Sequence, residues 1–126
     1  MRDVDLSVVT YRPDLALLAS LFASLAEAAA TLRLNLLVLD NSPESTTADE
    51  VAALAKRASS AWARVDVQRA GTNLGFGRGH DANAARATSP WLLVINQDCI
   101  VEPGALAALV ETAANDDAQV AAWEMR

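Results

Sequence analysis

The sequence predicts an α/β fold, a Rossmann-like three-layer sandwich around a mostly parallel sheet, in one domain that spans residues 1–126. Short aliphatic runs alternate along the chain with segments whose apolar residues recur at helical spacing. The distances between these runs suit strand–helix–strand units with right-handed crossovers. The composition agrees, because 52% of the residues are hydrophobic and only 5% are aromatic, which favours small aliphatic helices packed closely on a sheet.

The predicted elements follow from local signals. Pro13 and Asp14 suit the start of a helix, since proline fits the first helical position and an acid complements the helix dipole. Thr47 and Glu50 have the spacing of a capping box, before an apolar stripe that runs from Val51 to Trp62. We expect strands at residues 5–11, 34–39, 64–68, 91–95 and 119–123, and helices after Asp14, after Thr47, at 80–87 and after Pro103. The 34–39 and 91–95 runs are almost continuously aliphatic, which is typical of strands covered on both faces, whereas 64–68 suits an edge.

The composition excludes several classes of function. A formal net charge of −6 disfavours nucleic acids and anionic membranes as partners. The single cysteine, Cys99, rules out a disulfide within the chain and fits a reducing compartment. The chain shows no signal-peptide pattern and no apolar stretch of membrane-spanning length. We therefore expect a cytoplasmic location, or membrane association through a part or partner outside this chain.

Polar clusters follow four of the predicted strands, at residues 10–12, 40–42, 69–79 and 96–98. In open α/β sheets, ligands bind outside the carboxyl ends of the strands. Because the carboxyl ends of parallel strands share one edge, the four clusters are expected to meet there. A random distribution of polar residues would place some of them at the opposite edge.

Two of these clusters also fit simple turns. Asn96 and Asp98 are two residues apart, so in an extended chain they point to one side and offer oxygen ligands to Mg²⁺ or Mn²⁺. A polar turn that caps the next helix explains this triplet equally well when it is taken alone. Asp40 suits a hydrogen bond to a base or ribose, but residues 40–43 are typical turn residues, and without further context the turn is favoured.

The segment 70–80 holds four of the five glycines of the chain. Such a loop before a helix can present N–H groups to phosphate. Its place and pattern differ from the dinucleotide fingerprint and from the Walker A loop. His80, the single histidine, could act as a general base, but a polar residue at the start of a helix is the favoured interpretation. Cys99 is expected to be a small buried side chain.

Four segments together carry a resemblance to a known family. They are LSVVTYRPD, NLLVLDNSPES, RAGTNLGFGRGHDAN and WLLVINQDCIVEPGAL, and they cover most of the chain. In order and spacing they resemble the N-terminal, nucleotide-sugar-binding half of a family 2 glycosyltransferase of the GT-A fold. The rhamnosyltransferase-like branch, which builds cell-surface polysaccharides such as those of cell walls, is the most similar.

The resemblance implies an inverting transferase that moves a sugar from a UDP- or dTDP-sugar to a glycan or lipid-linked acceptor. Asp98 would be the acid of a DxD-like motif and would bind Mg²⁺ or Mn²⁺, although Asn96 stands where the motif has its first acid. The catalytic base would come from a part beyond residue 126, so no catalytic residue is assigned in this chain. The residues implied in nucleotide-sugar binding are Thr10, Arg12, Asp40, Asn73, Gly75, Gly77 and Asn96.

Three other interpretations remain at this stage. The chain is expected to be a truncated transferase, and such a fragment could bind a nucleotide without catalysing transfer. It could also self-associate, for example as a homodimer, because a truncated sheet exposes an edge and apolar surface. A phosphorylation-responsive receiver domain has a similar length but needs an acidic pair after the first strand, where this chain has Thr10, Tyr11 and Arg12.

Overall fold

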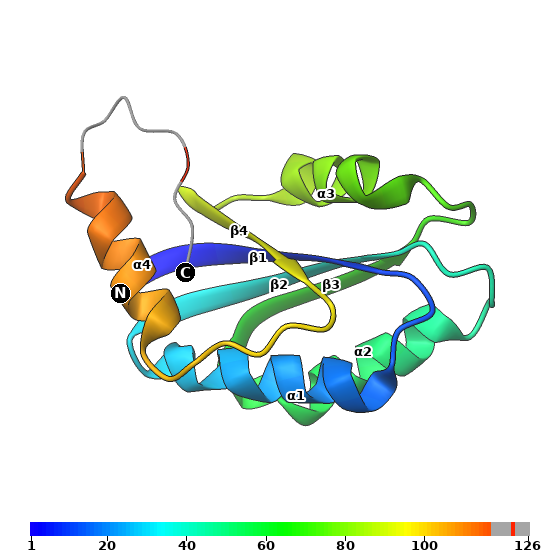
Figure 1. Cartoon of the computed structure of the whole chain (residues 1–126), viewed down its shortest axis with the longest axis horizontal. Coiled ribbons are helices and arrows are strands. Elements are labelled where there is room, and N and C mark those ends of the chain that lie inside the picture. The colour runs from blue at the N-terminus through cyan, green and yellow to red at the C-terminus, as the bar shows by residue number, and fades with distance from the viewer. Residues whose placement is uncertain (117–121, 123–126) are drawn as a thin grey trace.

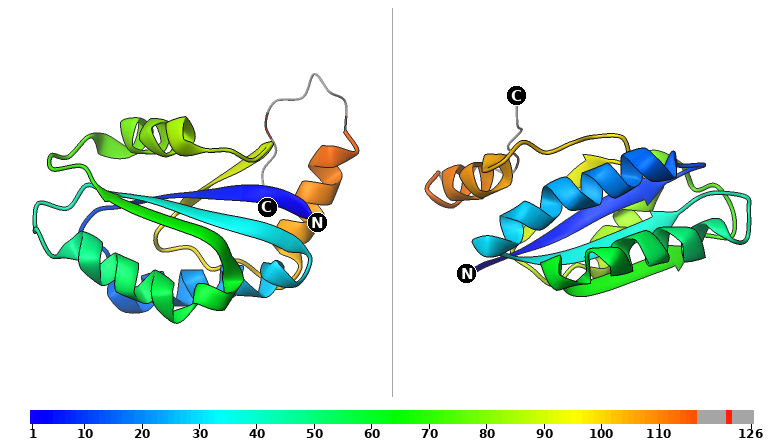
Figure 2. Two further views of the ribbon diagram at one scale, coloured as in Figure 1. Left: turned by 180° about the vertical axis from the view of Figure 1, so that it is seen from behind. Right: turned by 90° about the horizontal axis from the view of Figure 1, so that it is seen from below.

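The computed structural model describes residues 1–116 and 122 of the chain. Within these residues, four parallel strands form one sheet in the order β3-β2-β1-β4. Helices α1 and α2 cover one face of the sheet, α3 covers the other, and α4 lies near the start of β1 (Figures 1 and 2). The predicted α/β fold with a parallel sheet is therefore confirmed. The elements are β1 (Arg2–Thr10), α1 (Leu15–Ala26), η1 (Glu27–Ala30), β2 (Leu32–Asp40), α2 (Thr47–Arg57), η2 (Ser59–Ala61), β3 (Trp62–Arg69), α3 (Gly75–Arg86), β4 (Trp91–Asn96) and α4 (Ala105–Ala114).

The main core lies between the sheet and the α1–α2 layer. Alternate residues of β1 and β2 face this layer, since side chains of a strand point to opposite faces in turn. Trp62, which we expected at the end of a helical stripe, instead begins β3. Its indole Nε1 donates to the Ala55 carbonyl at 3.0 Å, and its ring meets Phe22 edge to face at 6.0 Å. The fully buried core side chains include Val4, Leu6, Val8, Leu18, Leu21, Leu25, Leu34, Leu36, Val38 and Val51.

The two predicted helix starts have different outcomes. The Asp14 carboxylate accepts hydrogen bonds from the N–H groups of Ala16 at 3.0 Å and Leu17 at 3.1 Å, so its predicted role at the start of α1 is confirmed. Pro13 does not take the first helical position, because Asp14 is the N-cap and α1 begins at Leu15. The predicted capping box at Thr47 is wrong. Thr46 precedes α2 without a capping hydrogen bond, and its hydroxyl donates to Glu50 Oε1 at 3.3 Å, while Thr47 is buried.

A buried carboxyl group, Asp5, fixes the turn between α3 and β4. It accepts hydrogen bonds from the N–H groups of Thr88 at 2.6 Å and Ser89 at 2.9 Å, from the Ser89 hydroxyl and from the Asn35 amide. Burial alone would raise the pKa of Asp5, but the hydrogen bonds from Ser89, Asn35 and Thr88 outweigh it and lower the pKa. The turn that sets the start of β4 therefore depends on an ionised side chain inside the fold.

Helix α3 begins five residues earlier than predicted, at Gly75 rather than at residue 80. The glycine-rich segment therefore contributes the first turns of a helix and not only a loop. Gly79 lies against the sheet, where a Cβ atom would be 2.7 Å and 2.9 Å from the two methyl groups of Val9. Only a residue without a side chain lets the helix approach β1 this closely.

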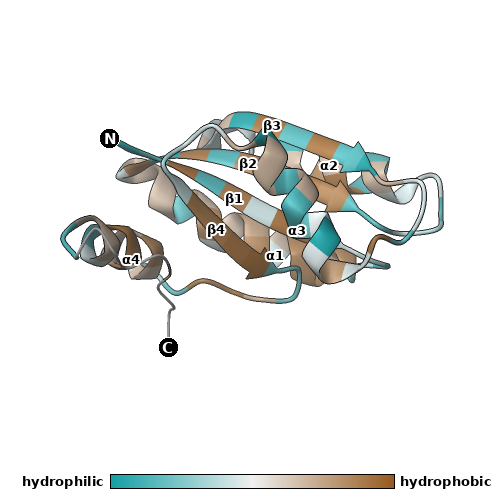
Figure 3. Cartoon of the chain, turned by 90° about the horizontal axis from the view of Figure 1, so that it is seen from above, coloured by the Kyte–Doolittle hydropathy of each residue, from teal (hydrophilic) through white to brown (hydrophobic). Residues whose placement is uncertain are grey.

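Within the described part of the chain, strand β4 is covered on one face only, which corrects the prediction for residues 91–95. Leu92 is 39% exposed and Val94 is 48% exposed, on the face of the sheet where α3 packs. Helix α3 packs over β1 and β2, which leaves β4 at the open side of that layer (Figure 3). Its aliphatic sequence thus reflects one buried face and one exposed face. The prediction that β3 is an edge strand is confirmed.

Two further expectations concern the rest of the chain. Across residues 1–116 and 122, no helix has the length and apolar character needed to cross a membrane. The strand expected at 119–123 falls, apart from residue 122, outside the described residues.

Gly79→Ala should destabilise the fold by about 1–3 kcal/mol, because the added methyl group overpacks the contact with Val9. Gly77→Ala is the matched control, since nothing lies within 4 Å of its Cβ position in the same helix. The control should stabilise the protein by up to about 1 kcal/mol through helix propensity. Urea unfolding followed by tryptophan fluorescence measures both changes, and an equal effect of the two substitutions would refute the close contact.

Candidate functional site

The carboxyl ends of β1, β2 and β4 and the start of α3 enclose a pocket of about 430 Å³. We call it the strand-end pocket. It lies where parallel strands present their carboxyl ends, which is the usual ligand position in such sheets. Its lining is rich in amides and contains one carboxylate, Asp98. The residues that line it are Val9, Tyr11, Asn41, Asn73, Gly75, Phe76, Asn96, Gln97 and Asp98.

A buried carboxyl group braces the strand ends beside this pocket. Asp40 Oδ1 accepts hydrogen bonds from the hydroxyl groups of Thr10 at 2.9 Å and Ser42 at 2.7 Å, and from the Ser42 N–H at 3.2 Å. Asp40 and Thr10 are fully buried and pair across β2 and β1. Asp40 Oδ2 is also buried and has no hydrogen-bond partner among the described residues, so it keeps capacity to accept a donor group.

Asn41 and Asn73 shape the loop before α3. Asn41 Oδ1 accepts from the Leu74 N–H at 3.1 Å, and its amide donates to the Gly75 carbonyl at 3.0 Å. Asn73 Oδ1 accepts from the Gly75 N–H at 2.9 Å. Gly75 has a φ of +80°, a conformation that glycine adopts without strain. Two amide side chains therefore hold the start of α3 at the pocket.

Gln97 joins the ends of β1 and β4. Its Oε1 accepts from the Tyr11 N–H at 3.0 Å, and its Nε2 donates to the Tyr11 carbonyl at 3.2 Å. This pair of hydrogen bonds satisfies both backbone groups of one residue with one side chain. It fixes Tyr11, which is 43% exposed, at the wall of the pocket.

Asn96 and Asp98 both line the pocket, but not for the reason we predicted. The chain turns here rather than continuing extended, because Asn96 ends β4 and its carbonyl accepts from the Cys99 N–H at 3.3 Å. Both side chains are exposed, and no hydrogen bond from the described part of the chain occupies them. Their oxygen atoms suit a hard divalent cation, which takes its remaining ligands from water and phosphate. Within residues 1–116 and 122, no group of three acidic, histidine or cysteine residues could hold a metal ion by itself.

The predicted site residues thus divide into four groups. Asn73, Gly75, Asn96 and Asp98 line the strand-end pocket. Thr10 and Asp40 lie beneath its rim and do not line it, while Gly77 is exposed in the first turns of α3. Arg12 turns away and pairs with Glu44 at 3.2 Å, although its N–H donates to the Ser42 hydroxyl.

Sequence analysis missed five of the lining residues. Asn41 and Gln97 stand inside polar clusters that were recognised, next to Asp40 and Asp98, so their positions at strand ends were the available signal. Tyr11 directly follows Thr10. Phe76 stands inside the recognised glycine-rich segment, between Gly75 and Gly77. For Val9, the decisive fact is the position of α3 over β1, which the sequence does not reveal.

His80 has a different place from the one predicted. It is the sixth residue of α3, is only 7% exposed and has its Nδ1 2.7 Å from the Ser7 hydroxyl. Burial lowers its pKa below the usual 6.5, and the nearby Asp81 carboxylate opposes this shift only in part. It does not line the strand-end pocket. Cys99 is half-buried and packs against the core, close to the prediction.

Two arginine residues near the glycine-rich segment, Arg69 and Arg86, serve the fold. Arg86 forms an ion pair with Asp66 at 2.6 Å, and donates to the Val38 carbonyl at 3.1 Å and to the Asn83 side chain. Arg69 donates to the Pro43 carbonyl at 3.4 Å. Arg86 therefore fastens the end of α3 to the sheet rather than facing the pocket.

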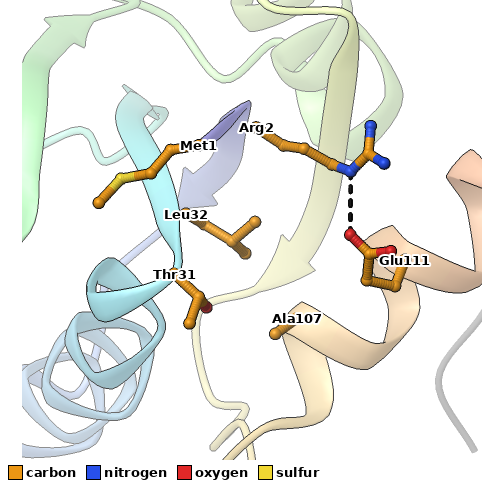
Figure 4. A pocket seen from close by; sticks show the side chains of 6 residues that line it. All are labelled: Met1, Arg2, Thr31, Leu32, Ala107 and Glu111. Carbon is orange, nitrogen blue, oxygen red and sulfur yellow. Dashed lines mark hydrogen bonds and ion pairs between the residues drawn. The ribbon is translucent and has the colours of Figure 1, made fainter.

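A second pocket, of about 440 Å³, lies at the opposite end of the sheet. Residues at the start of β1 and β2 and on α4 line it, and Arg2 pairs with Glu111 across it at 3.0 Å (Figure 4). None of the described residues in its lining has an amide side chain. Its position at the amino ends of parallel strands is not the usual ligand position.

Comparison with known proteins identifies a family. The model of the family described as "Glycosyl transferase family 2" matches residues 6–124, which is most of the chain. The resemblance that rested on four sequence segments is therefore confirmed at the level of the family. No curated protein matches the chain.

Solved structures with a similar fold include three crystal structures of TarS from S. aureus. One aligns with a TM-score of 0.68 at 19% identity and covers 90% of this chain but 20% of TarS. The structure of TarS 1-349 gives 0.66 at 18% identity, and that of TarS 1-349 in complex with UDP gives 0.67 at 18%; the chain spans 32% of each. The chain thus spans a third or less of these structures, and at this identity the likeness shows the fold alone.

The lowered pKa of His80 predicts an acid-sensitive fold. Protonation of His80 favours the unfolded chain, because the histidine has the higher pKa there. The stability that comes from neutral His80 is therefore complete above pH 6.5 and is lost as the pH falls through the pKa of the folded state. Chemical unfolding at about pH 7.5 and about pH 5.5 should show a decrease in stability for the natural protein and a smaller one for His80→Asn. Asp5 affects the stability only at lower pH, because its pKa is lowered from 3.8. Equal pH dependence of the two proteins would contradict this account of His80.

Proposed function

The chain belongs to glycosyl transferase family 2, and we propose that its strand-end pocket binds the nucleoside diphosphate part of a UDP- or dTDP-sugar donor. The sugar would pass to a glycan or lipid-linked acceptor, as in the rhamnosyltransferase-like branch that builds polysaccharides. One observation carries this proposal. A single pocket at the carboxyl ends of the strands collects Asn41, Asn73, Asn96, Gln97 and Asp98 from separate segments of the chain.

In the proposed binding mode, Asn96 and Asp98 hold Mg²⁺ or Mn²⁺ through their oxygen atoms. When bound, the ion would stabilise the charge that develops on the diphosphate as the anomeric C–O bond breaks. The remaining residues orient the donor. Asn41 and Asn73 hold the loop that borders it, and Gln97 holds the Tyr11 backbone beside it.

Thr10 and Asp40 are proposed to recognise the base and ribose. The free acceptor capacity of the buried Asp40 Oδ2 supports this role, since an N–H or O–H group of a nucleoside could use it. The Thr10 hydroxyl already donates to Oδ1 and keeps the carboxyl group oriented. A ligand would have to displace the groups that cover Oδ2 to reach it.

A second candidate is nucleotide binding without sugar transfer. Asp98 is the single carboxylate in the described lining of the pocket, so no second acid stands there to act as a general base toward an acceptor. Release of free nucleotide from a UDP-sugar, by transfer or by hydrolysis, would favour the transferase. Binding without release would favour the binding module.

Calorimetry with UDP, dTDP, GDP and ADP, with and without Mn²⁺, tests the proposed donor site. We expect UDP or dTDP to bind more tightly when Mn²⁺ is present. Asp98→Asn should reduce the metal-dependent affinity by roughly tenfold or more, since changes one shell further out already cost that much. Glu102→Gln removes the same charge from an exposed residue outside the pocket and should have no effect. Metal-dependent binding that survives Asp98→Asn would overturn the metal assignment.

We also propose that copies of the chain associate through β4. Among the described strands β4 lies at the edge of the sheet, it carries no charged residue, and Leu92 and Val94 are exposed on one face. Charged residues disfavour pairing at the opposite edge, where β3 contains Arg64, Asp66 and Arg69.

Val94→Lys should therefore reduce self-association in sedimentation velocity. Val65→Lys is the matched control, because Val65 is 40% exposed on the charged edge strand. It should leave the association unchanged. A natural protein that stays monomeric across the concentration range would contradict this proposal.

A further inference from the structure

The ring of Phe76 forms an apolar part of a pocket whose lining also contains four amide side chains. Phe76 is 58% exposed and lines the strand-end pocket from the first turn of α3. Gly75 and Gly77 flank it, and both have open space where a Cβ atom would lie. Its chain neighbours therefore place no side chains beside the ring, and a defined ring position needs another contact.

His80 supplies that contact. It follows Phe76 by one helical turn, and the two rings meet edge to face with centroids 4.4 Å apart and planes at 73°. The imidazole is itself fixed, because its Nδ1 lies 2.7 Å from the Ser7 hydroxyl on β1. Ser7 Oγ also accepts from the Asn83 amide at 3.0 Å, which ties the same hydroxyl to α3.

The hydrogen bonding of His80 does not by itself explain an imidazole at this position. Its Nε2 is buried and has no hydrogen-bond partner in the part of the chain that the structure describes. A buried nitrogen without a partner is unfavourable, so the hydrogen bond to Ser7 alone gives no reason for a ring with a second nitrogen. The imidazole also contributes the ring that contacts Phe76.

We propose that His80 is a positioning residue that holds the Phe76 ring as the apolar wall against which a bound nucleoside diphosphate packs. The proposal rests on the proposed function for its ligand. His80 does not line the pocket, so it acts through Phe76 and not on the ligand directly. Because His80 is buried and contacts Ser7 on β1, the strand fixes the imidazole, and the imidazole fixes Phe76 at the pocket wall.

Two substitutions of His80 separate the ring contact from the hydrogen bond. His80→Asn retains a polar group for Ser7 and loses the ring, so it should weaken UDP binding by about three- to tenfold, the range that an edge-to-face pair is worth. His80→Phe retains a ring against Phe76 and loses the hydrogen bond. It should lower the melting temperature but keep most of the affinity for UDP.

Phe76→Leu completes a double-mutant cycle in calorimetry with UDP and Mn²⁺. If His80 acts through Phe76, the combined His80→Asn and Phe76→Leu protein should bind no more weakly than Phe76→Leu alone. Additive losses, or full affinity in His80→Asn, would overturn the proposal. Circular dichroism confirms that each variant is folded at the temperature of the titration.

An NMR measurement on the protein without ligand tests the positioning itself. The chain has two phenylalanines and one histidine, so selective labelling isolates their ring signals. We expect ring-to-ring nuclear Overhauser effects between Phe76 and His80, and a Phe76 shift that changes in His80→Asn and persists in His80→Phe. Phe22, which packs on Trp62, is the internal control and should not change.

These two measurements distinguish failure of the inference from failure of the proposed function. If the ring contact is present but no nucleoside diphosphate binds, the donor site is wrong and the role of His80 toward that ligand falls with it. If UDP binds and the Phe76 signals do not respond to His80→Asn, the donor site stands and the positioning role is refuted.

Discussion

The buried carboxyl group of Asp40 is the constraint on which the arrangement of the strand ends depends. It accepts three hydrogen bonds, from the Thr10 hydroxyl and from the hydroxyl and N–H of Ser42. The Ser42 hydroxyl in turn accepts from the Arg12 N–H, so both loops that leave β1 and β2 are tied to one group. A carboxyl group without exposure to water is costly unless such donors surround it. The position of the loops and the burial of this group are therefore coupled.

Amide side chains extend this arrangement to the other two segments of the pocket. Asn41 and Gln97 each donate one hydrogen bond and accept another, which lets one side chain fix a backbone segment. Neither adds a charge. Asp98 is then the single carboxylate in the described lining, so a diphosphate would face little repulsion once a divalent cation neutralises it. Neutral positioning groups and one acid are a suitable combination for an anionic ligand.

The sequence predicted the fold class well because the spacing of apolar residues and the alternation of strands with helices along the chain are local signals. It also placed the strand-end clusters at one edge, where Asn73, Asn96 and Asp98 line a common pocket. It failed where tertiary packing decides. The helix start at Gly75 depends on the hydrogen bonds of Asn41, a residue distant in sequence, and on the contact of Gly79 with Val9. The exposed face of β4 depends on where α3 lies, and Trp62 belongs to a strand although its spacing also fits the preceding helix.

The central claim is that a nucleoside diphosphate binds at the carboxyl ends of the strands. Amide chemical-shift mapping of the ¹⁵N-labelled chain during titration with UDP and Mg²⁺ tests it most directly, because the two pockets lie at opposite ends of the sheet. The account predicts perturbations at Tyr11, Asn41, Leu74 to Phe76 and Gln97. Perturbations confined to Arg2, Thr31, Leu32 and Glu111, or none at saturating UDP, would contradict it.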